Sequence, residues 1–297
     1  MTFHPGEIAV QMRAGVREAA ERLSPFISDT IKPAALEFLQ TQPIAIASTI
    51  AENGRVWTSL LSGSPGFIQP LDEQVIQMQA IVPSTDPLHQ NLRHDPHLGL
   101  LVIDLVNRRR LRLNGIATLQ LGSINLQLQQ VFFNCPKYIQ TRYLKTTIAS
   151  TSQPPETQTR LCLSESDRHW ITSADTFFIA TAHSASGADA SHRGGYPGFV
   201  QIASSDRLLF PDYAGNNMFQ TFGNLAVNPN AGLLFIDFDQ GHTLQLTGKA
   251  TVLWDTERMT SFKGAQRLVE FAIEQILETR NATTLRWQFG DYSPANP

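Results

Sequence analysis

The chain has 297 residues, of which 42% are hydrophobic and 16% charged, and its formal net charge is −3. This composition indicates a globular protein with enough apolar side chains for two domains, and it excludes a disordered chain. The small negative charge argues against a general nucleic-acid binder, which normally needs a basic face. No apolar stretch approaches the ~18–20 residues that span a bilayer, so we expect no membrane segment.

The two cysteines, Cys135 and Cys162, fit neither a disulfide framework nor the spacing of a zinc site. The first residues lack the basic-then-apolar pattern of a secretory signal. Together these features predict a cytoplasmic protein without a structural metal.

The first half begins with helical patterns and continues with strands. Helices are predicted at 7–23, 33–40, 86–94 and 134–145. Strands are predicted at 44–50, 56–61, 75–82, 98–105 and 110–120, with Asn53-Gly54 as the turn between the first two. Residues 146–159 are rich in Ser, Thr, Gln and Pro, which is typical of an exposed linker.

The second half repeats the order. Helices are predicted at 165–173, 217–227 and 262–278, and strands at 177–183, 198–203, 208–210, 232–238 and 243–254. We therefore expect one domain at 1–150, with N-terminal helices, and another at 151–297, with a C-terminal helix and tail. Short strands with hairpin spacing favour a mainly β (α+β) chain of small barrels with flanking helices over a parallel sheet.

The halves also share sequence. The segment LGLLVIDL at 98–105 returns as AGLLFIDF at 231–238, and LRLNGIAT at 111–118 returns as LQLTGKAT at 244–251. PGFI at 65–68 and AIAS at 45–48 have counterparts at 197–200 and 178–181 in the same order. A period of about 133 residues is far longer than the ~20–50 residues of a solenoid repeat. It predicts two related β-rich halves that arose by internal duplication.

The halves differ at one place where a site is expected. The second half has DASHRGG at 189–195 where the first has WTSLLSG at 57–63. Arginine, hydroxyl and amide side chains on a glycine-rich backbone suit a phosphate group, because the charged guanidinium of arginine is a bidentate hydrogen-bond donor. The alternative is an irregular surface loop in which glycine and asparagine only form turns.

Several ordered motifs in the second half resemble the pyridoxamine 5′-phosphate oxidase-like family. They are HRGGxPGFV from 192, PDxxGNN from 211, NPxxGLLF from 228 and LxGxA from 246. This resemblance implies two flavin-binding split-barrel halves in one chain, with FMN in the groove between two barrels. Split barrels of this kind commonly pair, so the resemblance also makes a homodimer an expectation.

The resemblance implies which residues hold the cofactor. The phosphate end would be formed by Ser191, His192, Arg193, Asn216 and Asn217. The facing half would add Arg110 and Arg112, which share one face of a strand because they are two residues apart. Leu60 and Leu61 stand at the mirror-image positions and cannot bind phosphate, so we expect one flavin site per chain.

Activity as the oxidase itself is not expected, since the chain lacks the Arg-x-Val-Leu-Lys strand, the Ser-Arg-Lys segment and the Arg-Leu-x-Pro ending of that enzyme. The leading hypothesis is an FMN-dependent oxidoreductase that exchanges electrons with a small redox substrate, a nicotinamide donor or oxygen. The alternatives are a non-catalytic flavin, haem or deazaflavin protein, or an interaction module. No catalytic acid or base is assigned by the sequence.

Overall fold

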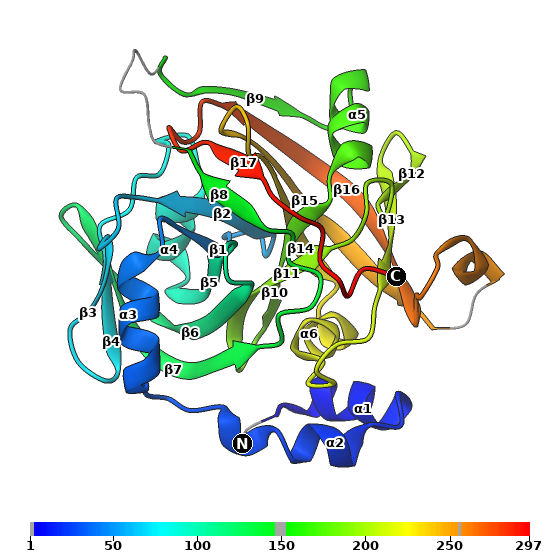
Figure 1. The fold of residues 1–297 in the computed structure, drawn as a ribbon, viewed down its shortest axis with the longest axis horizontal. Coiled ribbons are helices and arrows are strands. Elements are labelled where there is room, and N and C mark those ends of the chain that lie inside the picture. The colour runs from blue at the N-terminus through cyan, green and yellow to red at the C-terminus, as the bar shows by residue number, and fades with distance from the viewer. Residues whose placement is uncertain (1–2, 146–152, 255–256) are drawn as a thin grey trace.

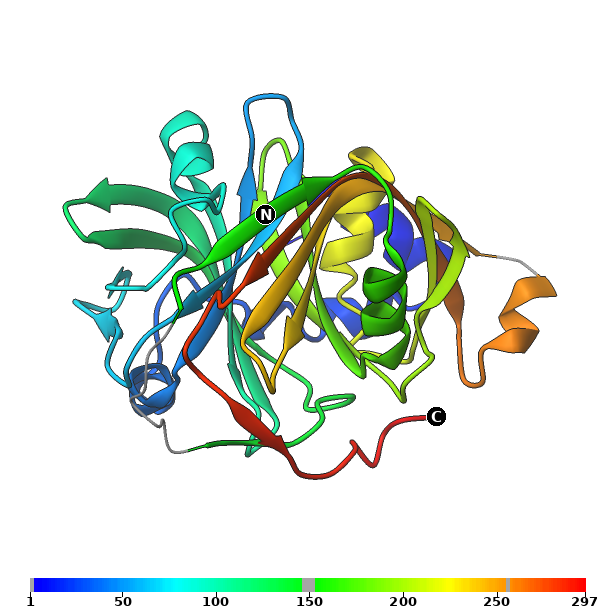
Figure 2. The same cartoon turned by 90° about the horizontal axis from the view of Figure 1, so that it is seen from above.

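A computed structural model describes residues 3–145, 153–254 and 257–297 (Figure 1). Its strands form two large antiparallel sheets that lie side by side (Figures 1 and 2). The first has seven strands in the order β2-β1-β5-β6-β7-β4-β3, and the second follows the order β11-β10-β14-β15-β16-β13-β12, with β9 paired to β16. The prediction of a mainly β chain with two split-barrel halves is confirmed.

The strands of the first sheet are β1 (Ile44–Ile50), β2 (Val56–Ser62), β3 (Ile68–Pro70), β4 (Val75–Met78), β5 (His97–Asp104), β6 (Arg109–Gln120) and β7 (Ser123–Asn134). Those of the second are β9 (Glu156–Arg160), β10 (Thr176–His183), β11 (Gly187–Gly194), β12 (Gln201–Ser204), β13 (Arg207–Asp212), β14 (Asn230–Asp237), β15 (His242–Leu253) and β16 (Arg267–Arg280). A small sheet pairs β8 (Arg142–Leu144) with β17 (Trp287–Phe289) and so joins the first half to the C-terminal tail.

The helices are α1 (Pro5–Arg13), α2 (Arg17–Glu21), α3 (Pro33–Thr41), α4 (Leu88–His94), α5 (Glu165–Ser173) and α6 (Gln220–Val227), with 3₁₀ turns at Ser24–Phe26 and Glu257–Ser261. The expected helices at 33–40 and 165–173 are present as α3 and α5. The expected helix at 7–23 is instead two helices, because the chain turns between them at Gly15, whose φ is 69°. In Figure 1, α1 lies against α6, and α2 lies beside α1.

The two sheets agree in detail as well as in order. Each has a bulge between its two longest strands, after Asn114 in the first and after Thr247 in the second, 133 residues later. The same connections and the same irregularity recur in both halves. Origin from one duplicated unit stays a prediction.

The halves pack through β1, β2 and β5 of the first against β10, β11 and β14 of the second. Apolar side chains from both, including Ile46, Leu101, Phe178 and Leu234, form one shared cluster. Two equivalent glycines let the backbones approach. A Cβ at Gly99 would lie 2.5 Å from the Ala188 carbonyl oxygen, and one at Gly232 would lie 2.7 Å from that of Val56.

Two of the predicted helices are wrong, and the predicted linker is tested only in part. The expected C-terminal helix at 262–278 is strand β16, whose apolar residues pack in the barrel core while its backbone pairs with β15 and β13. The expected helix at 134–145 is the end of β7, an irregular segment and β8, and Tyr138 within it has a φ of 68°. Of the expected linker at 146–159, residues 146–152 lie outside the described residues, and the rest leads into β9.

Candidate functional site

A pocket lies where the two halves meet, and all seven residues singled out from the sequence line it. The first half contributes β6 and the segment that follows β7, and the second contributes β11, β13 and the segment that leads into α6. Its side chains are mostly polar or aromatic: Arg110, Arg112, Asn134, Cys135, Tyr138, Ser191, His192, Arg193, Asp212, Tyr213, Asn216, Asn217, Phe219, Thr221, Phe222 and Arg267. The inner cavity measures about 90 Å³. The alternative of an irregular surface loop at 189–195 is wrong, because most of this segment is the buried strand β11.

Arg110 is a buried cation without an acidic partner. Only 8% of the residue is exposed, and it forms no ion pair with any of the described residues. Its Nη1 lies 2.9 Å from His192 Nδ1 and its Nη2 lies 3.6 Å from Cys135 Sγ. Burial, together with the charges of Arg112 and Arg193, lowers the pKa of Arg110 to about 10, so the guanidinium is still charged at neutral pH.

Arg112, two residues along the same strand, is paired. Its Nη1 donates to both carboxylate oxygens of Asp189, at 3.0 and 2.9 Å, and its Nη2 donates to Ser191 Oγ at 2.7 Å. Because the serine oxygen accepts from arginine, its own hydroxyl hydrogen is free to be donated to another group.

His192 is fixed as a neutral donor. An arginine can only donate, so the Nδ1 that faces Arg110 must be an acceptor and the ring proton sits on Nε2. Burial lowers the pKa of His192 well below its usual range, and the adjacent charge of Arg110 acts in the same direction. His192 therefore offers an Nε2–H group, and this group has no partner in the structure.

Two further arginines share one carboxylate at the other side of the pocket. Arg193 Nη1 donates to Asp212 Oδ1 at 3.1 Å, and Arg267 donates to Oδ2 from Nε at 2.9 Å and from Nη2 at 2.8 Å. Sequence reasoning missed Asp212 and Arg267 as members of the site. Arg267 lies in the segment taken for a helix, and only its pairing opposite Asp212 on β13 brings it here.

The unsatisfied groups of the structure gather in this pocket. Eight buried side-chain nitrogen or oxygen atoms in the described part of the chain lack a hydrogen-bond partner, and five of them belong to the pocket. They are Nε of Arg110, Arg112 and Arg193, Nε2 of His192 and Oδ1 of Asn134. Four of the five are N–H donors. Buried donors are normally satisfied, so this set points to a bound group rich in acceptor oxygens.

The segment before α6 is held in an unusual backbone conformation. Asn217 has a φ of 64° and Phe219 a φ of 62°, in the left-handed region. Asparagine tolerates this region, whereas a phenylalanine there is strained by about 1–2 kcal/mol. Asn216 stabilises the turn by accepting from the Met218 backbone N–H at 3.2 Å. The first residues of α6, which has no side-chain cap, lie at the pocket wall directly after this segment.

An apolar groove adjoins this pocket and shares Cys135 and Asn216 with it. The groove measures about 500 Å³. Its walls come from the segment between α2 and α3, the start of α3, β6, β7 and the segment before α6: Leu23, Phe26, Ser28, Thr30, Lys32, Ala34, Ala35, Leu111, Val131, Phe132, Phe133 and Met218. A compact cationic pocket thus opens onto a wider apolar groove.

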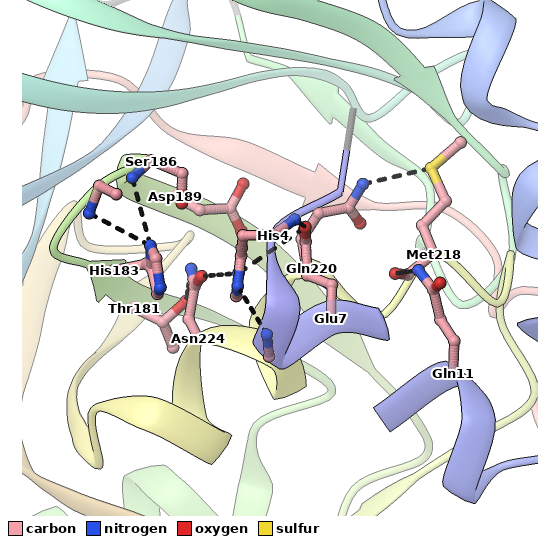
Figure 3. A network of polar contacts seen from close by, with 12 residues as sticks. His4, Glu7, Gln11, Thr181, His183, Ser186, Asp189, Met218, Gln220 and Asn224 are labelled. Carbon is pink, nitrogen blue, oxygen red and sulfur yellow. Dashed lines mark hydrogen bonds and ion pairs between the residues drawn. The ribbon is translucent and has the colours of Figure 1, made fainter. Parts of the chain in front are cut away.

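The N-terminal helix α1 packs against α6, whose first residues line the pocket, and polar contacts join this helix to the second half (Figure 3). The His4 ring stacks on His183, with centroids 4.0 Å apart, and its Nε2 lies 2.9 Å from Asn224 Oδ1 on α6. Glu7 accepts from the His4 backbone N–H at 2.7 Å. Burial is the main cause that raises the pKa of Glu7 to about 7; the charge of Asp189 acts in the same direction, and the charge of Arg112 acts against it.

Glu7→Gln should stabilise the protein at pH 8. The raised pKa of Glu7 means that folding favours the protonated form, so its contribution is complete below about pH 4.5 and is lost as the pH rises to about 7. A glutamine keeps the acceptor for the His4 backbone and removes the buried charge. We expect a gain on the order of 3 kcal/mol at pH 8, from the size of the pKa change. His4, with a pKa lowered to about 4 by burial, stays neutral at that pH. Thermal unfolding at pH 5 and pH 8 tests this, and an equal effect at both would contradict it.

Together, the two sheets define a split-barrel fold with a donor-rich pocket where its halves meet. Residues 163–286, most of the second half, match the family model described as pyridoxamine 5′-phosphate oxidase, so this part of the chain is similar to that family. No curated protein matches the chain.

Among solved structures, the chain resembles HupZ of group A Streptococcus at 11% identity and a TM-score of 0.33, over 38% of this chain and 91% of that one. It also resembles FAD-binding proteins of Mesorhizobium loti (13% identity, TM-score 0.30, 42% of this chain and 97% of that one) and of Mycobacterium smegmatis (13%, 0.30, 41% and 98%). None of the helices in the described part of the chain is long and apolar enough to cross a bilayer.

Proposed function

We propose that the chain binds FMN at the junction of its two halves and acts as a flavin-dependent oxidoreductase of the cytoplasm. The observation that carries the proposal is the buried guanidinium of Arg110, which lacks a carboxylate partner. An unpaired buried charge is strongly destabilising unless another group neutralises it. A ligand that brings negative charge into the pocket supplies that group.

The charge of the pocket matches a phosphate monoester. Four guanidinium groups face two carboxylates, those of Asp189 and Asp212, which leaves an excess of two positive charges. A phosphate monoester carries about −1.5 to −2 at pH 7 and has three acceptor oxygens for unpaired N–H groups. The inner cavity of about 90 Å³ suits a single terminal phosphate, which favours FMN over FAD.

The apolar groove suits the ring of the same ligand. Flavin rings are planar and largely apolar, with polar atoms along one edge, and Ser28, Thr30 and Lys32 offer donors at the groove wall. Cys135 lies at the junction between pocket and groove, so it would stand beside the ring or its ribityl chain.

When bound, the flavin supplies the electron transfer, and the protein supplies binding, orientation and exclusion of water. The strand that faces the ligand carries Ser191, His192 and Arg193 rather than the oxidase pattern, so a substrate other than pyridoxamine phosphate is proposed. His192 holds its proton on Nε2 and donates to the phosphate, which leaves no role for it as a base. Homodimer formation stays a prediction.

Titration of the protein with FMN and with riboflavin tests the proposal. The phosphate should contribute at least about 100-fold in affinity, the equivalent of two charge-assisted hydrogen bonds to buried donors. Quenching of flavin fluorescence gives both dissociation constants, and bleaching of bound flavin by NADH or NADPH separates an enzyme from a carrier. Equal affinity for FMN and riboflavin, or a purified protein with a haem Soret band, would contradict the proposal.

A further inference from the structure

The internal repeat gives residues of the cationic pocket counterparts in the opposite half of the chain. Ser191 pairs with Ile179 between β11 and β10, and Ser59 pairs with Ala47 between β2 and β1, 132 residues earlier. Gln245 pairs with Leu234, as Arg112 pairs with Leu101, 133 residues earlier. Ser59 and Gln245 therefore hold the mirror-image places of Ser191 and Arg112.

The helices beside the two sites, α4 near Ser59 and α6 near Ser191, are equivalent as well. Asn91 of α4 donates to Thr49 Oγ1 at 3.0 Å, and Asn224 of α6 donates to Thr181 Oγ1 at 3.0 Å. Each helix is thus fixed to the first strand of its own sheet by the same asparagine–threonine contact. The backbone N–H of Leu88 corresponds to that of Thr221, 133 residues later.

The mirror-image place is already occupied by a carboxylate of the chain. Asp86 Oδ1 accepts from Ser59 Oγ at 2.6 Å and from the Leu88 backbone N–H at 2.9 Å, and its Oδ2 accepts from Gln245 Nε2 at 3.0 Å. These three donors are the counterparts of Ser191 Oγ, the Thr221 backbone N–H and Arg112. The buried carboxylate thus bridges the two halves and the start of the helix.

In the cationic pocket no such carboxylate is supplied by the equivalent segment. The position 133 residues after Asp86 is Phe219, whose side chain has no acceptor. The Ser191 hydroxyl hydrogen and Arg112 Nε remain without an acceptor there.

We propose that the Asp86 carboxylate is an internal substitute for the anionic group of the ligand. It fills the mirror-image site, so that the chain binds one ligand, and its contacts identify the donors that hold the ligand's phosphate: Ser191 Oγ, Arg112 and the Thr221 backbone N–H. This inference deepens the proposed function and rests on it for the identity of the ligand, but not for the anion site itself. Burial raises the pKa of Asp86 to about 6, so the carboxylate is still largely ionised at neutral pH.

Chemical rescue with small anions tests the mirror-image site. Asp86→Ala should lower the melting temperature, and 50–100 mM formate or inorganic phosphate should recover much of that loss, because the anion enters the vacated place. Asp86→Asn retains the shape of the side chain and should not respond to anions. Asp104→Ala is the matched control, since Asp104 is another buried carboxylate that accepts only from the turn at Val106 and Asn107. Rescue of Asp104→Ala to the same extent as Asp86→Ala would overturn the proposal.

A second measurement applies to the intact pocket and does not depend on the folding of the Asp86 variants. Calorimetric titration of wild type with inorganic phosphate should give one site, and Ser191→Ala should weaken it about tenfold, as expected for one hydrogen bond to a charged acceptor. Undiminished phosphate binding by Ser191→Ala would overturn the assignment of donors. Rescue of Asp86→Ala together with a failure to bind FMN would reject the proposed function and leave this inference standing.

Discussion

Replacing Arg110 with methionine should abolish tight FMN binding while leaving the ligand-free protein at least as stable as the wild type. Arg110 is buried, has no acidic partner and has a pKa lowered to about 10 by burial. Methionine has a similar length and no charge, and replacing a buried charge with a well-packed apolar side chain is often neutral or stabilising by ~1–4 kcal/mol. The loss of a charge-assisted contact to phosphate should weaken FMN binding at least about 100-fold.

The matched control is Arg109→Met on the adjacent position of β6. Successive residues of a strand point to opposite faces, and the Arg109 guanidinium lies over the rings of Phe38 and Phe133 instead of in the pocket. Its replacement should leave FMN affinity within about twofold, as is usual for a residue outside the interface. Fluorescence titration and thermal unfolding of both variants give the comparison. A strongly destabilised Arg110→Met protein, or one with undiminished FMN binding, would contradict the account.

Arg112→Gln, in contrast to Arg110→Met, should destabilise the ligand-free protein. It leaves the Asp189 carboxylate buried without its two contacts from Arg112 Nη1, and only the amide contact from Asn114, at 3.1 Å, remains. Breaking one side of a buried ion pair destabilises a protein by about 3–5 kcal/mol. For a protein of this size, that corresponds to a fall in melting temperature of about 10 °C. FMN binding should be lost as well.

The double variant Arg112→Gln with Asp189→Asn separates the two effects. Removal of both charges leaves no uncompensated carboxylate, so most of the stability should return. FMN binding should not return, because the guanidinium that faces the phosphate is still absent. Denaturant unfolding and FMN titration of the single and double variants test this, and recovery of neither property would point to a packing role for Arg112.

Most strands could be predicted from the sequence, and so could seven residues that line the pocket. The repeat is visible in the sequence itself. The hydrophobic pattern of β5 and β14 is strong, and the spacing of Arg110 and Arg112 placed both side chains on one strand face. The motif from His192 to Val200 indicated a resemblance to the family whose model matches residues 163–286. Each of these patterns lies within one short segment, so it can be recognised in the sequence without knowledge of the tertiary packing.

The remaining features depend on contacts between distant segments. Nine of the fourteen residues of strand β16 are charged or good helix formers, such as Leu268 and Glu270, and only its pairing with neighbouring strands makes it a strand. The contact of Arg267 with Asp212 follows from that pairing. The Asp86 bridge joins residues 159 positions apart, so no local pattern could show it.

A crystal structure of the protein soaked with FMN tests the central claim most directly. We predict the phosphate in the pocket between the halves, with its oxygens within about 3.2 Å of Arg110 Nε and His192 Nε2 and the ring in the groove beside Cys135. Density for the flavin at another surface, with these two nitrogens still without a ligand oxygen, would contradict it.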